Sequence, residues 1–244
     1  IITNTFGAAR HVLEAIDLDE RFPELIHRAV ALAEEAIARA AEGRRVWIAG
    51  SISNFAAENV ADNTPPPEVA KANYKEQSEL LAEAGADLIA LEMMHDTEQS
   101  RYAIEAAAAT GLPVWVGFSC KIGADGETVV FWGPGPEVSF EDSFDLLMSA
   151  GGTLAGVMHS EIETMEPALD IVLEKWPGSV AAYPHRGHFI MPEWQFVDAI
   201  SPEDYLAEAK KWVAMGAQVI GGCCGIGPDH IRLLKEKLPK KVPA

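Results

Sequence analysis

The chain has 244 residues, of which 48% are hydrophobic and 23% are charged, a composition typical of a folded globular protein. Its formal net charge of −18 argues against nucleic acid and anionic membranes as partners, because binding to phosphates needs a basic surface. No uninterrupted apolar run is long enough to span a bilayer, and the first residues do not form a secretion leader. The three cysteines do not form a disulfide framework and favour a reducing, cytoplasmic setting.

Strands and helices alternate along the chain, beginning with an apolar, β-branched strand at residues 1–6. Further strands are expected at residues 46–49, 87–94, 113–120, 154–158, 179–183 and 219–220. Helices are expected at residues 23–43, 71–86, 96–110, 139–150, 163–176, 201–216 and 228–238. Asp96 and Ser201 are the expected N-caps of two of these helices. Residues 122–136 are expected to be irregular, with a turn at Asp125-Gly126, and residues 54–69 to form a long loop.

Short apolar strands separated by helices are typical of parallel sheets that are buried on both faces. Seven alternations at about thirty residues each predict an α/β fold of the (β/α)₈ TIM barrel type, which needs roughly 250 residues. Because one unit is lacking and the chain does not begin with methionine, we expect the first β/α unit to be missing from it. An open doubly wound sheet is the runner-up, although no Gly-x-Gly-x-x-Gly follows an early strand. We expect residues 1–244 to form a single domain.

Two adjacent cysteines, Cys223 and Cys224, follow the last predicted strand within a glycine-rich stretch that leads to Pro228. Neighbouring side chains of an extended chain point to opposite faces, so both thiols reach one ion only if the backbone turns sharply. The flanking glycines allow such a turn, and zinc is the commonest partner of thiolates. Two alternatives stay open, namely that the cysteines are simply buried or that the glycine-rich turn holds a phosphate.

Other polar residues follow the predicted strands, at the end where barrel active sites lie. His159 directly follows the strand at 154–158 and is a candidate third zinc ligand, with Cys120 as its competitor and a bond to a neighbouring loop as the alternative. Glu92 has no obvious partner and is expected to bind a substrate ammonium or to form a structural ion pair. Arg186 is a candidate for binding a carboxylate, with simple solvation as the alternative. The candidate substrate-binding residues are Glu92, Asn4 and Ser51.

With these residues assembled, the chain resembles the homocysteine S-methyltransferase family over nearly its whole length. The most specific motif is Ile220-Gly-Gly-Cys-Cys-Gly225, followed by Pro228 and His230-Ile231. Further segments that look like the family's strand motifs are Ile2-Thr-Asn-Thr-Phe6, Ala49-Gly-Ser-Ile52, Leu91-Glu-Met-Met94, Gly117-Phe-Ser-Cys120 and Ala182-Tyr-Pro184. The resemblance implies a (β/α)₈ barrel that holds Zn²⁺ through the two adjacent cysteines and a third ligand after strand six.

The chain departs from the family pattern at two strand ends. The third zinc ligand of the family is the cysteine of a Gly-hydrophobic-Asn-Cys motif, which here reads Gly156-Val-Met-His159. The resemblance therefore implies a metal site of Cys223, Cys224 and His159, a set that suits zinc and carries less negative charge than three cysteines. The family's Pro-Asn-Ser-Gly segment reads Pro184-His-Arg-Gly187.

By resemblance, the chain is expected to be a zinc-dependent S-methyltransferase that moves a methyl group from an onium-type or similar donor to homocysteine or a related small thiol. Such a step belongs to methionine biosynthesis, and Glu92 would hold the amino group of homocysteine. Trp194, Phe196 and the loops at 54–69 and 187–199 are expected to shape the donor pocket. The expected partners are the small-molecule thiol and the methyl donor, and homo-oligomerisation stays open. Two alternatives are a divergent barrel enzyme with a different substrate and a non-catalytic relative that binds a thiol or a metal.

Overall fold

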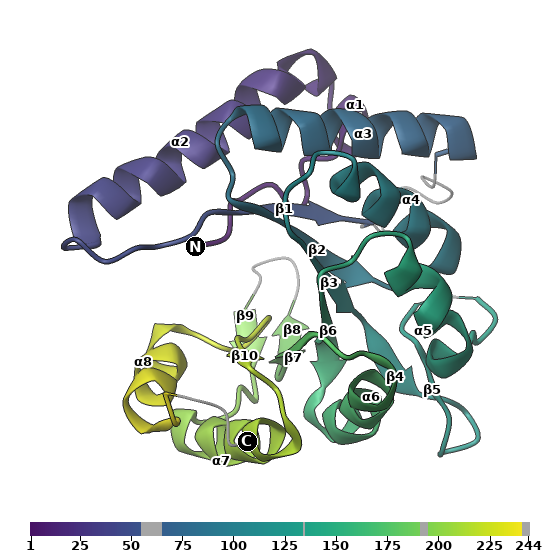
Figure 1. Ribbon diagram of the computed structural model, residues 1–244, viewed down its shortest axis with the longest axis vertical. Coiled ribbons are helices and arrows are strands. Elements are labelled where there is room, and N and C mark those ends of the chain that lie inside the picture. Colours follow the sequence, from purple (N-terminus) through teal and green to yellow (C-terminus); the bar gives the residue numbers. More distant parts are fainter. Residues whose placement is uncertain (55–64, 134, 191–194, 241–244) are drawn as a thin grey trace. The chain divides into compact units, whose positions relative to one another are not determined.

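The computed structural model describes residues 1–54, 65–133, 135–190 and 195–240 (Figure 1). The contacts within the chain group its residues into two compact units. Unit 1 consists of Ile1–Val116 and Leu146–Thr153, and unit 2 consists of Gly117–Asp145 and Leu154–Ala244. The expectation that residues 1–244 form a single domain stays a prediction.

Among the described residues, six parallel strands form the main sheet in the order β1-β2-β3-β6-β7-β10. Their bounds are β1 (Ala49–Ser53), β2 (Leu88–Met94), β3 (Val114–Phe118), β6 (Leu154–Glu161), β7 (Ser179–His185) and β10 (Val219–Ile220). Strands β1 and β2 are buried along their whole length, as is typical of parallel strands covered on both faces. The parallel order confirms the predicted α/β fold and fits a partial (β/α)₈ barrel.

Helices follow most of these strands and begin close to the predicted positions. Their bounds are α1 (Arg10–Glu14), α2 (Phe22–Ala40), α3 (Pro67–Glu83), α4 (Thr97–Ala108), α5 (Phe140–Ser149), α6 (Ile162–Lys175), α7 (Pro202–Met215) and α8 (Pro228–Lys237). The side chain of Asp96 accepts a hydrogen bond from the backbone N–H of Gln99, and that of Ser201 accepts one from Asp204, so both predicted N-caps are confirmed. No helix formed by the described residues is both long enough and apolar enough to cross a membrane.

In unit 1, helices α2, α3 and α4 lie side by side, and α3 and α4 pack on strands β1 and β2 (Figure 1). Helix α2 has an apolar face of Ile26, Val30, Ala33 and Ile37, which the periodicity of the sequence predicts. Ile26 and Val30 have no exposed surface, Ala33 has 5%, and Ile37 is half-buried. These positions recur every three or four residues, so the spacing of 3.6 residues per turn places them along one stripe. This stripe anchors the first long helix to the rest of unit 1.

In unit 2, three phenylalanines pack around Phe118 at the end of β3. The ring centroid of Phe118 lies 5.3 Å from that of Phe140, 5.7 Å from that of Phe144 and 6.2 Å from that of Phe131. The rings meet at tilted angles, which is the arrangement that aromatic pairs prefer. Because these side chains are almost completely buried, they form much of the apolar support beneath the polar residues that follow β3 and β6.

The prediction of a regular strand at residues 1–6 is wrong. Only an isolated parallel bridge forms there, between Ile2 and Ala49. The backbone N–H of Thr5 donates back to the carbonyl oxygen of Thr3, and this tight turn ends the extended stretch. The strand predicted at residues 46–49 begins later, at Ala49, and runs to Ser53.

Two segments predicted to be irregular contain antiparallel hairpins. In the first, β4 (Cys120–Ile122) pairs with β5 (Val129–Phe131), and the predicted Asp125-Gly126 turn joins them. The run Val129-Val-Phe131 is a short β-branched and aromatic strand signal, which sequence reasoning passed over. In the second, β8 (His188–Ile190) pairs with β9 (Gln195–Val197), while residues 191–194 lie outside the described part of the chain.

The aromatic cluster yields a stability prediction. Replacing Phe118 with alanine removes a fully buried ring, and we expect it to lower the free energy of unfolding by about 3–5 kcal/mol. The control is Leu146→Ala on α5, where the side chain is 59% exposed, with an expected change within about 0.5 kcal/mol. Urea unfolding of both variants checks this, and an equal effect of the two substitutions contradicts it.

Candidate metal centre

The loop after β10 brings the two adjacent thiols to the same side of the backbone. The N–H of Cys223 donates to the carbonyl oxygen of Pro184 (2.7 Å), and the carbonyl oxygen of Cys224 accepts from the N–H of Arg186 (3.0 Å). Gly225 follows at φ +80°, a conformation that glycine adopts without strain. A Cβ atom at this position would lie 1.7 Å from the Arg186 carbonyl oxygen, so only glycine fits. The loop is thereby tied to the end of β7, and the two sulfur atoms lie 3.6 Å apart.

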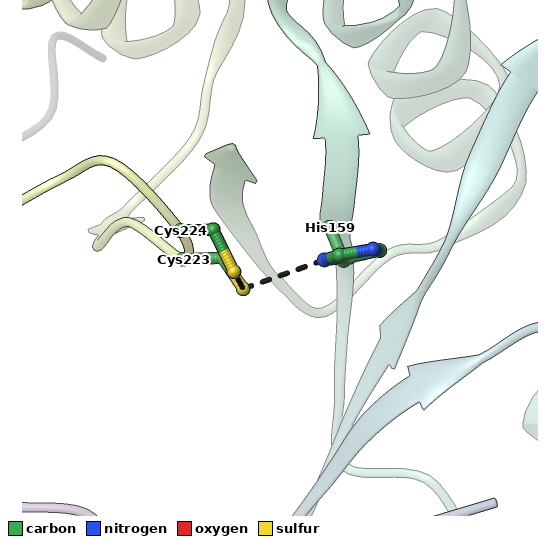
Figure 2. Close-up of side chains that lie close together, drawn as sticks. All are labelled: His159, Cys223 and Cys224. Carbon is green, nitrogen blue, oxygen red and sulfur yellow. Dashed lines mark hydrogen bonds between the residues drawn. The ribbon is translucent and has the colours of Figure 1, made fainter. Parts of the chain in front are cut away.

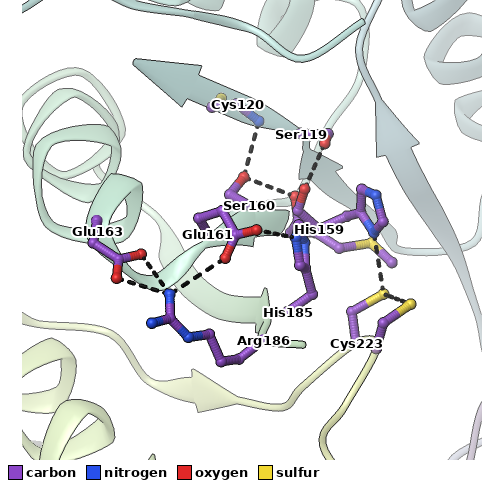
Figure 3. Close-up of polar contacts among 11 residues, drawn as sticks. Ser119, Cys120, His159, Ser160, Glu161, Glu163, His185, Arg186 and Cys223 are labelled. Atoms are coloured by element: carbon purple, nitrogen blue, oxygen red, sulfur yellow. Dashed lines mark hydrogen bonds and ion pairs between the residues drawn. The ribbon is translucent and has the colours of Figure 1, made fainter. Parts of the chain in front are cut away.

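His159 projects from an irregular stretch of β6. The pairing of β6 with β7 shifts register between Met158 and Glu161, and His159 adopts φ +47°. Its carbonyl oxygen accepts a hydrogen bond from the Ser119 hydroxyl (2.8 Å), while the Ser160 hydroxyl donates to the Met158 carbonyl oxygen (3.0 Å; Figure 3). This bulge directs the imidazole toward the cysteine loop, as bulges near functional sites often do.

The three side chains meet at distances that suit one metal ion (Figure 2). The Cys223 sulfur lies 3.5 Å from Nδ1 of His159 and 3.6 Å from the Cys224 sulfur, and all three potential ligand atoms lie within 4.8 Å of one another. Tetrahedral zinc with ordinary bond lengths would separate two sulfur ligands by about 3.8 Å and a sulfur and a nitrogen ligand by about 3.6 Å. The residues present therefore fit a zinc ion.

The environment of Cys224 favours its thiolate form. The hydrogen bond from Cys223 is the largest cause that lowers the pKa of the Cys224 thiol, to about 5. Burial opposes this shift, whereas the hydrogen bond and charge of His159 and the charge of His185 add to it. Because metal ligands must be deprotonated, this environment prepares the site for a cation.

The competing ligand, Cys120, lies in a different environment. Its side chain is buried, its N–H donates to the Ser160 hydroxyl (2.9 Å), and burial raises the pKa of its thiol. Within the described part of the chain, the group of side chains able to hold a metal contains His159 and not Cys120. The roles of His159, Cys223 and Cys224 as metal ligands stay predictions.

A buried carboxylate occupies the end of β2 in unit 1. Glu92 is 6% exposed and accepts a short hydrogen bond from the Ser51 hydroxyl. Burial raises the pKa of the Glu92 carboxyl, and the hydrogen bond from Ser51 opposes this shift. Among the described residues, no lysine or arginine lies within ion-pair distance of Glu92, so the structure does not support the alternative of a structural ion pair.

The other two candidate substrate residues, Ser51 and Asn4, have different surroundings. Ser51 contacts Glu92, whereas Asn4 is exposed and lines a shallow groove against α2. Two threonines that the sequence did not single out for a role support Ser51: the Thr5 hydroxyl donates to its carbonyl oxygen (2.6 Å), and the Thr3 hydroxyl accepts from its N–H (3.0 Å). The sequence contained a signal for this support, because side chains alternate along residues 1–6 and Thr3 and Thr5 therefore point to the same face.

The segment after β7 forms ion pairs that sequence reasoning missed. The Arg186 guanidinium pairs with Glu163 (2.7 Å) and lies 3.6 Å from the Glu161 carboxylate (Figure 3). Arg186 is therefore neither simply solvated nor free to bind the carboxylate of a substrate. Nε2 of His185 lies 3.0 Å from the Glu161 carboxylate. Trp132, directly after β5, is a further missed residue, since its ring lies 5.4 Å from that of His159. Trp194 and residues 55–64, expected near the donor pocket, lie outside the described residues, as does the side chain of Phe196.

A parallel β/α sheet with a candidate metal centre at the carboxyl ends of its strands defines the class of β/α-barrel enzymes. The family model for homocysteine S-methyltransferase matches residues 1–238. The chain therefore belongs to the homocysteine S-methyltransferase family, which is a family of enzymes, and the predicted membership is confirmed.

Relatives and solved structures agree with this membership. The chain is 26% identical to a selenocysteine methyltransferase of Astragalus bisulcatus, over 95% of the chain and 76% of the relative. It is 26% identical to homocysteine S-methyltransferase 1 of Zea mays, over 68% of the chain but only 50% of the relative, so it spans about half the length of that protein. The metallated form of the homocysteine methyltransferase MmuM from Escherichia coli shares the fold, with a TM-score of 0.73 and 24% identity over 97% of the chain and 78% of MmuM.

The low pKa of Cys224 yields a prediction for the metal-free, reduced protein. We expect the alkylation rate at Cys224 to stay nearly constant from pH 8 to pH 6 and to fall as the pH drops through about 5, because the thiolate is the nucleophile. Iodoacetamide labelling followed by peptide mass spectrometry measures this rate. Cys120, which is buried and has a raised pKa, serves as the internal control and should stay unlabelled. A midpoint near pH 8.5, as in a free cysteine, contradicts the prediction.

The burial of Glu92 yields a prediction about stability and pH. A carboxyl group whose folded pKa is raised costs stability once the pH rises above its unfolded pKa of about 4.3. We therefore expect Glu92→Gln to raise the melting temperature at pH 7, with a gain that shrinks as the pH falls toward 4. The exposed Glu83→Gln is the matched control, with a change within about 0.5 kcal/mol. Differential scanning calorimetry decides, and a lower melting temperature for Glu92→Gln at pH 7 would show a cation bound to the native carboxylate.

Proposed function

We propose that the protein is a zinc-dependent S-methyltransferase that moves a methyl group from an onium-type donor to homocysteine or a related small thiol. The observation that supports this proposal is the distance of the Cys223 sulfur from the Cys224 sulfur and from His159 Nδ1, because both distances match edges of a tetrahedral zinc site. Membership in the homocysteine S-methyltransferase family supports the reaction class. The selenocysteine methyltransferase among the relatives supports testing selenocysteine as a second acceptor.

In this proposal, Cys223, Cys224 and His159 hold the zinc ion. Bound zinc supplies a Lewis acid that favours the thiolate form of a sulfur substrate at neutral pH. The three side chains would hold the ion without supplying all four ligands that zinc takes, so a small thiol could bind without displacing a protein group. The thiol proton leaves to water, so no side chain is needed as a general base.

Glu92 is proposed to bind the ammonium group of the amino-acid acceptor. The Glu92 carboxylate is 6% exposed and has no cationic side chain near it among the described residues, so a substrate cation would stabilise its anionic form. The Ser51 hydroxyl and the threonines behind it hold this carboxylate in place. Asn4 is proposed to bind substrate more weakly, because it is exposed in the groove beside α2.

The transfer itself needs orientation rather than further acid or base chemistry. The new carbon–sulfur bond forms while the bond from the methyl carbon to the positively charged donor atom breaks in line with it. The donor then leaves as a neutral thioether or tertiary amine, and the acceptor becomes a methyl thioether. Holding both partners in line is worth several orders of magnitude in rate.

The remaining parts of the proposal follow from the same chemistry. Methylation of homocysteine gives methionine, which places the reaction in methionine biosynthesis. The two neighbouring free thiols need a reducing compartment, so we propose the cytoplasm as the setting. Residues 1–244 are proposed to act as one barrel domain, and a homo-oligomer is compatible with this.

The first test is metal content and turnover of freshly purified, reduced protein. We expect about one zinc per chain by mass spectrometry of the metal, and methyl transfer to homocysteine or selenocysteine from a methylsulfonium, a quaternary ammonium or a methylated cobalamin. Cys224→Ser should lower zinc affinity by more than about 100-fold, beyond the loss typical of residues outside the ligand shell. Cys120→Ser is the matched control and should keep both metal and activity, because Cys120 lies outside the cluster.

Two results would overturn this proposal. Folded protein without zinc would remove the metal mechanism and leave a divergent barrel enzyme with a different substrate. Protein that binds zinc and thiol while none of the donors loses its methyl group would be a non-catalytic relative.

A further inference from the structure

The second ring nitrogen of His159 has no protein partner among the described residues. A ligand histidine generally donates its second ring N–H to a carboxylate, a carbonyl oxygen or water, and this bond fixes the ring plane. Nδ1 of His159 faces the Cys223 sulfur, and no hydrogen bond joins Nε2 to a residue in the described part of the chain. Rotation about the bond to a histidine ring is intrinsically loose, because this torsion has broad minima. Among the described residues, the contacts that restrict the ring plane are therefore those of neighbouring side chains.

Two aromatic rings contact the imidazole of His159. The ring of Trp132 lies 5.4 Å away at an interplanar angle of 87°, and the ring of His185 lies 4.5 Å away at 38°. Edge and tilted contacts of this kind are the favoured arrangements of aromatic pairs. The pair restricts the rotation that would take the Nδ1 lone pair away from the two sulfurs.

Each flanking ring is itself held by the fold of unit 2. The backbone N–H of Trp132 donates to the carbonyl oxygen of Ser119 (2.9 Å), and the hydroxyl of the same serine donates to the carbonyl oxygen of His159 (2.8 Å). Ser119 thus fixes the spacing between the two segments. His185 is 13% exposed, and its Nε2 donates to the Glu161 carboxylate (3.0 Å; Figure 3).

The orientation matters more for an imidazole than for a thiolate. The lone pair of a ring nitrogen lies in the ring plane, so a rotated ring turns its lone pair away from the ion. A thiolate sulfur carries several lone pairs and accepts a metal over a wider range of directions. An imidazole ligand consequently gains more than a thiolate does from neighbours that hold its ring plane.

We propose that His185, held by Glu161, and Trp132 are positioning residues that clamp the ring of His159 in the orientation needed for metal binding. This inference rests on the proposed function, because it assumes that His159 is a ligand. His185 itself stays outside the ligand group, which among the described residues comprises His159, Cys223 and Cys224. The clamp acts through the ring of His159, and His185→Phe, which removes the charge of His185 near Cys224 but keeps a ring, separates packing from charge.

The test is a double-mutant cycle on zinc affinity, measured by competition with a chromophoric chelator in the full chain. We expect His185→Asn to weaken zinc binding by about 10- to 100-fold, the range typical of residues that support a ligand. In the His159→Cys background the same substitution should change the affinity by no more than about twofold, because a thiolate needs no clamp. His185→Phe keeps a ring in place and should retain more affinity than His185→Asn.

A second variant and a spectrum distinguish the loss of ring positioning from a general loss of structure. Trp132→Leu should weaken zinc binding in the native background and Trp132→Phe should preserve it, with unchanged unfolding midpoints in urea. In the cobalt-substituted protein, His185→Asn should shift the d–d bands while the sulfur charge-transfer bands keep their intensity. Equal losses in both backgrounds of the cycle, or no loss in either, would overturn the clamp. If zinc binds to the native chain and the cycle shows no coupling, only this inference fails; if the native chain binds no zinc, the proposed function fails as well.

Discussion

The candidate site depends on one close backbone contact, between the cysteine loop and the segment after β7. Gly225 passes the carbonyl oxygen of Arg186 so closely that any side chain would collide with it, and the two hydrogen bonds beside it join the loops. Without this contact, adjacent cysteines would point apart, as neighbours on an extended chain do. The contact therefore brings two thiols that are adjacent in the sequence to the same side of the backbone. The two sulfur atoms and the imidazole of His159 all lie in unit 2.

The two polar centres of the chain depend on their surroundings in opposite ways. Among the described residues, no cationic side chain lies near the buried Glu92, so its carboxylate costs stability above its unfolded pKa, because a charge that has left water needs a partner. The pKa of the Cys224 thiol is lowered instead, so the folded surroundings favour its thiolate. Both kinds of perturbed group are typical of functional sites. Their positions at the ends of β2 and after β10 agree with the general location of active sites in β/α folds.

Much of the fold and of the candidate site could be predicted from the sequence. The features that could not be predicted were missed for physical reasons. Alternating apolar segments predicted the parallel sheet, and the rule that strand ends converge predicted that His159 would approach Cys223. Hairpin β4–β5 was missed because three-residue strands give too little periodicity to distinguish them from a loop. Trp132 could not be placed beside His159 for the same reason, since its position follows from that hairpin. The contact of Ser51 with Glu92 was likewise hidden, because register between parallel strands is a tertiary property.

The histidine in the cluster has consequences for the charge of the proposed centre. Two thiolates and a neutral imidazole around Zn²⁺ sum to zero, whereas the three thiolates implied by the family resemblance sum to −1. A neutral centre withdraws more electron density from an added sulfur, so it favours the thiolate at lower pH but makes that thiolate a weaker nucleophile. In the proposed centre, orientation of the substrates would have to recover the lost reactivity, because among the described residues the ligand group holds no further anion. The positions of the ligand side chains would then matter more than the charge of the centre, and the rings around His159 and the bulge in β6 are the features that fix the position of this histidine.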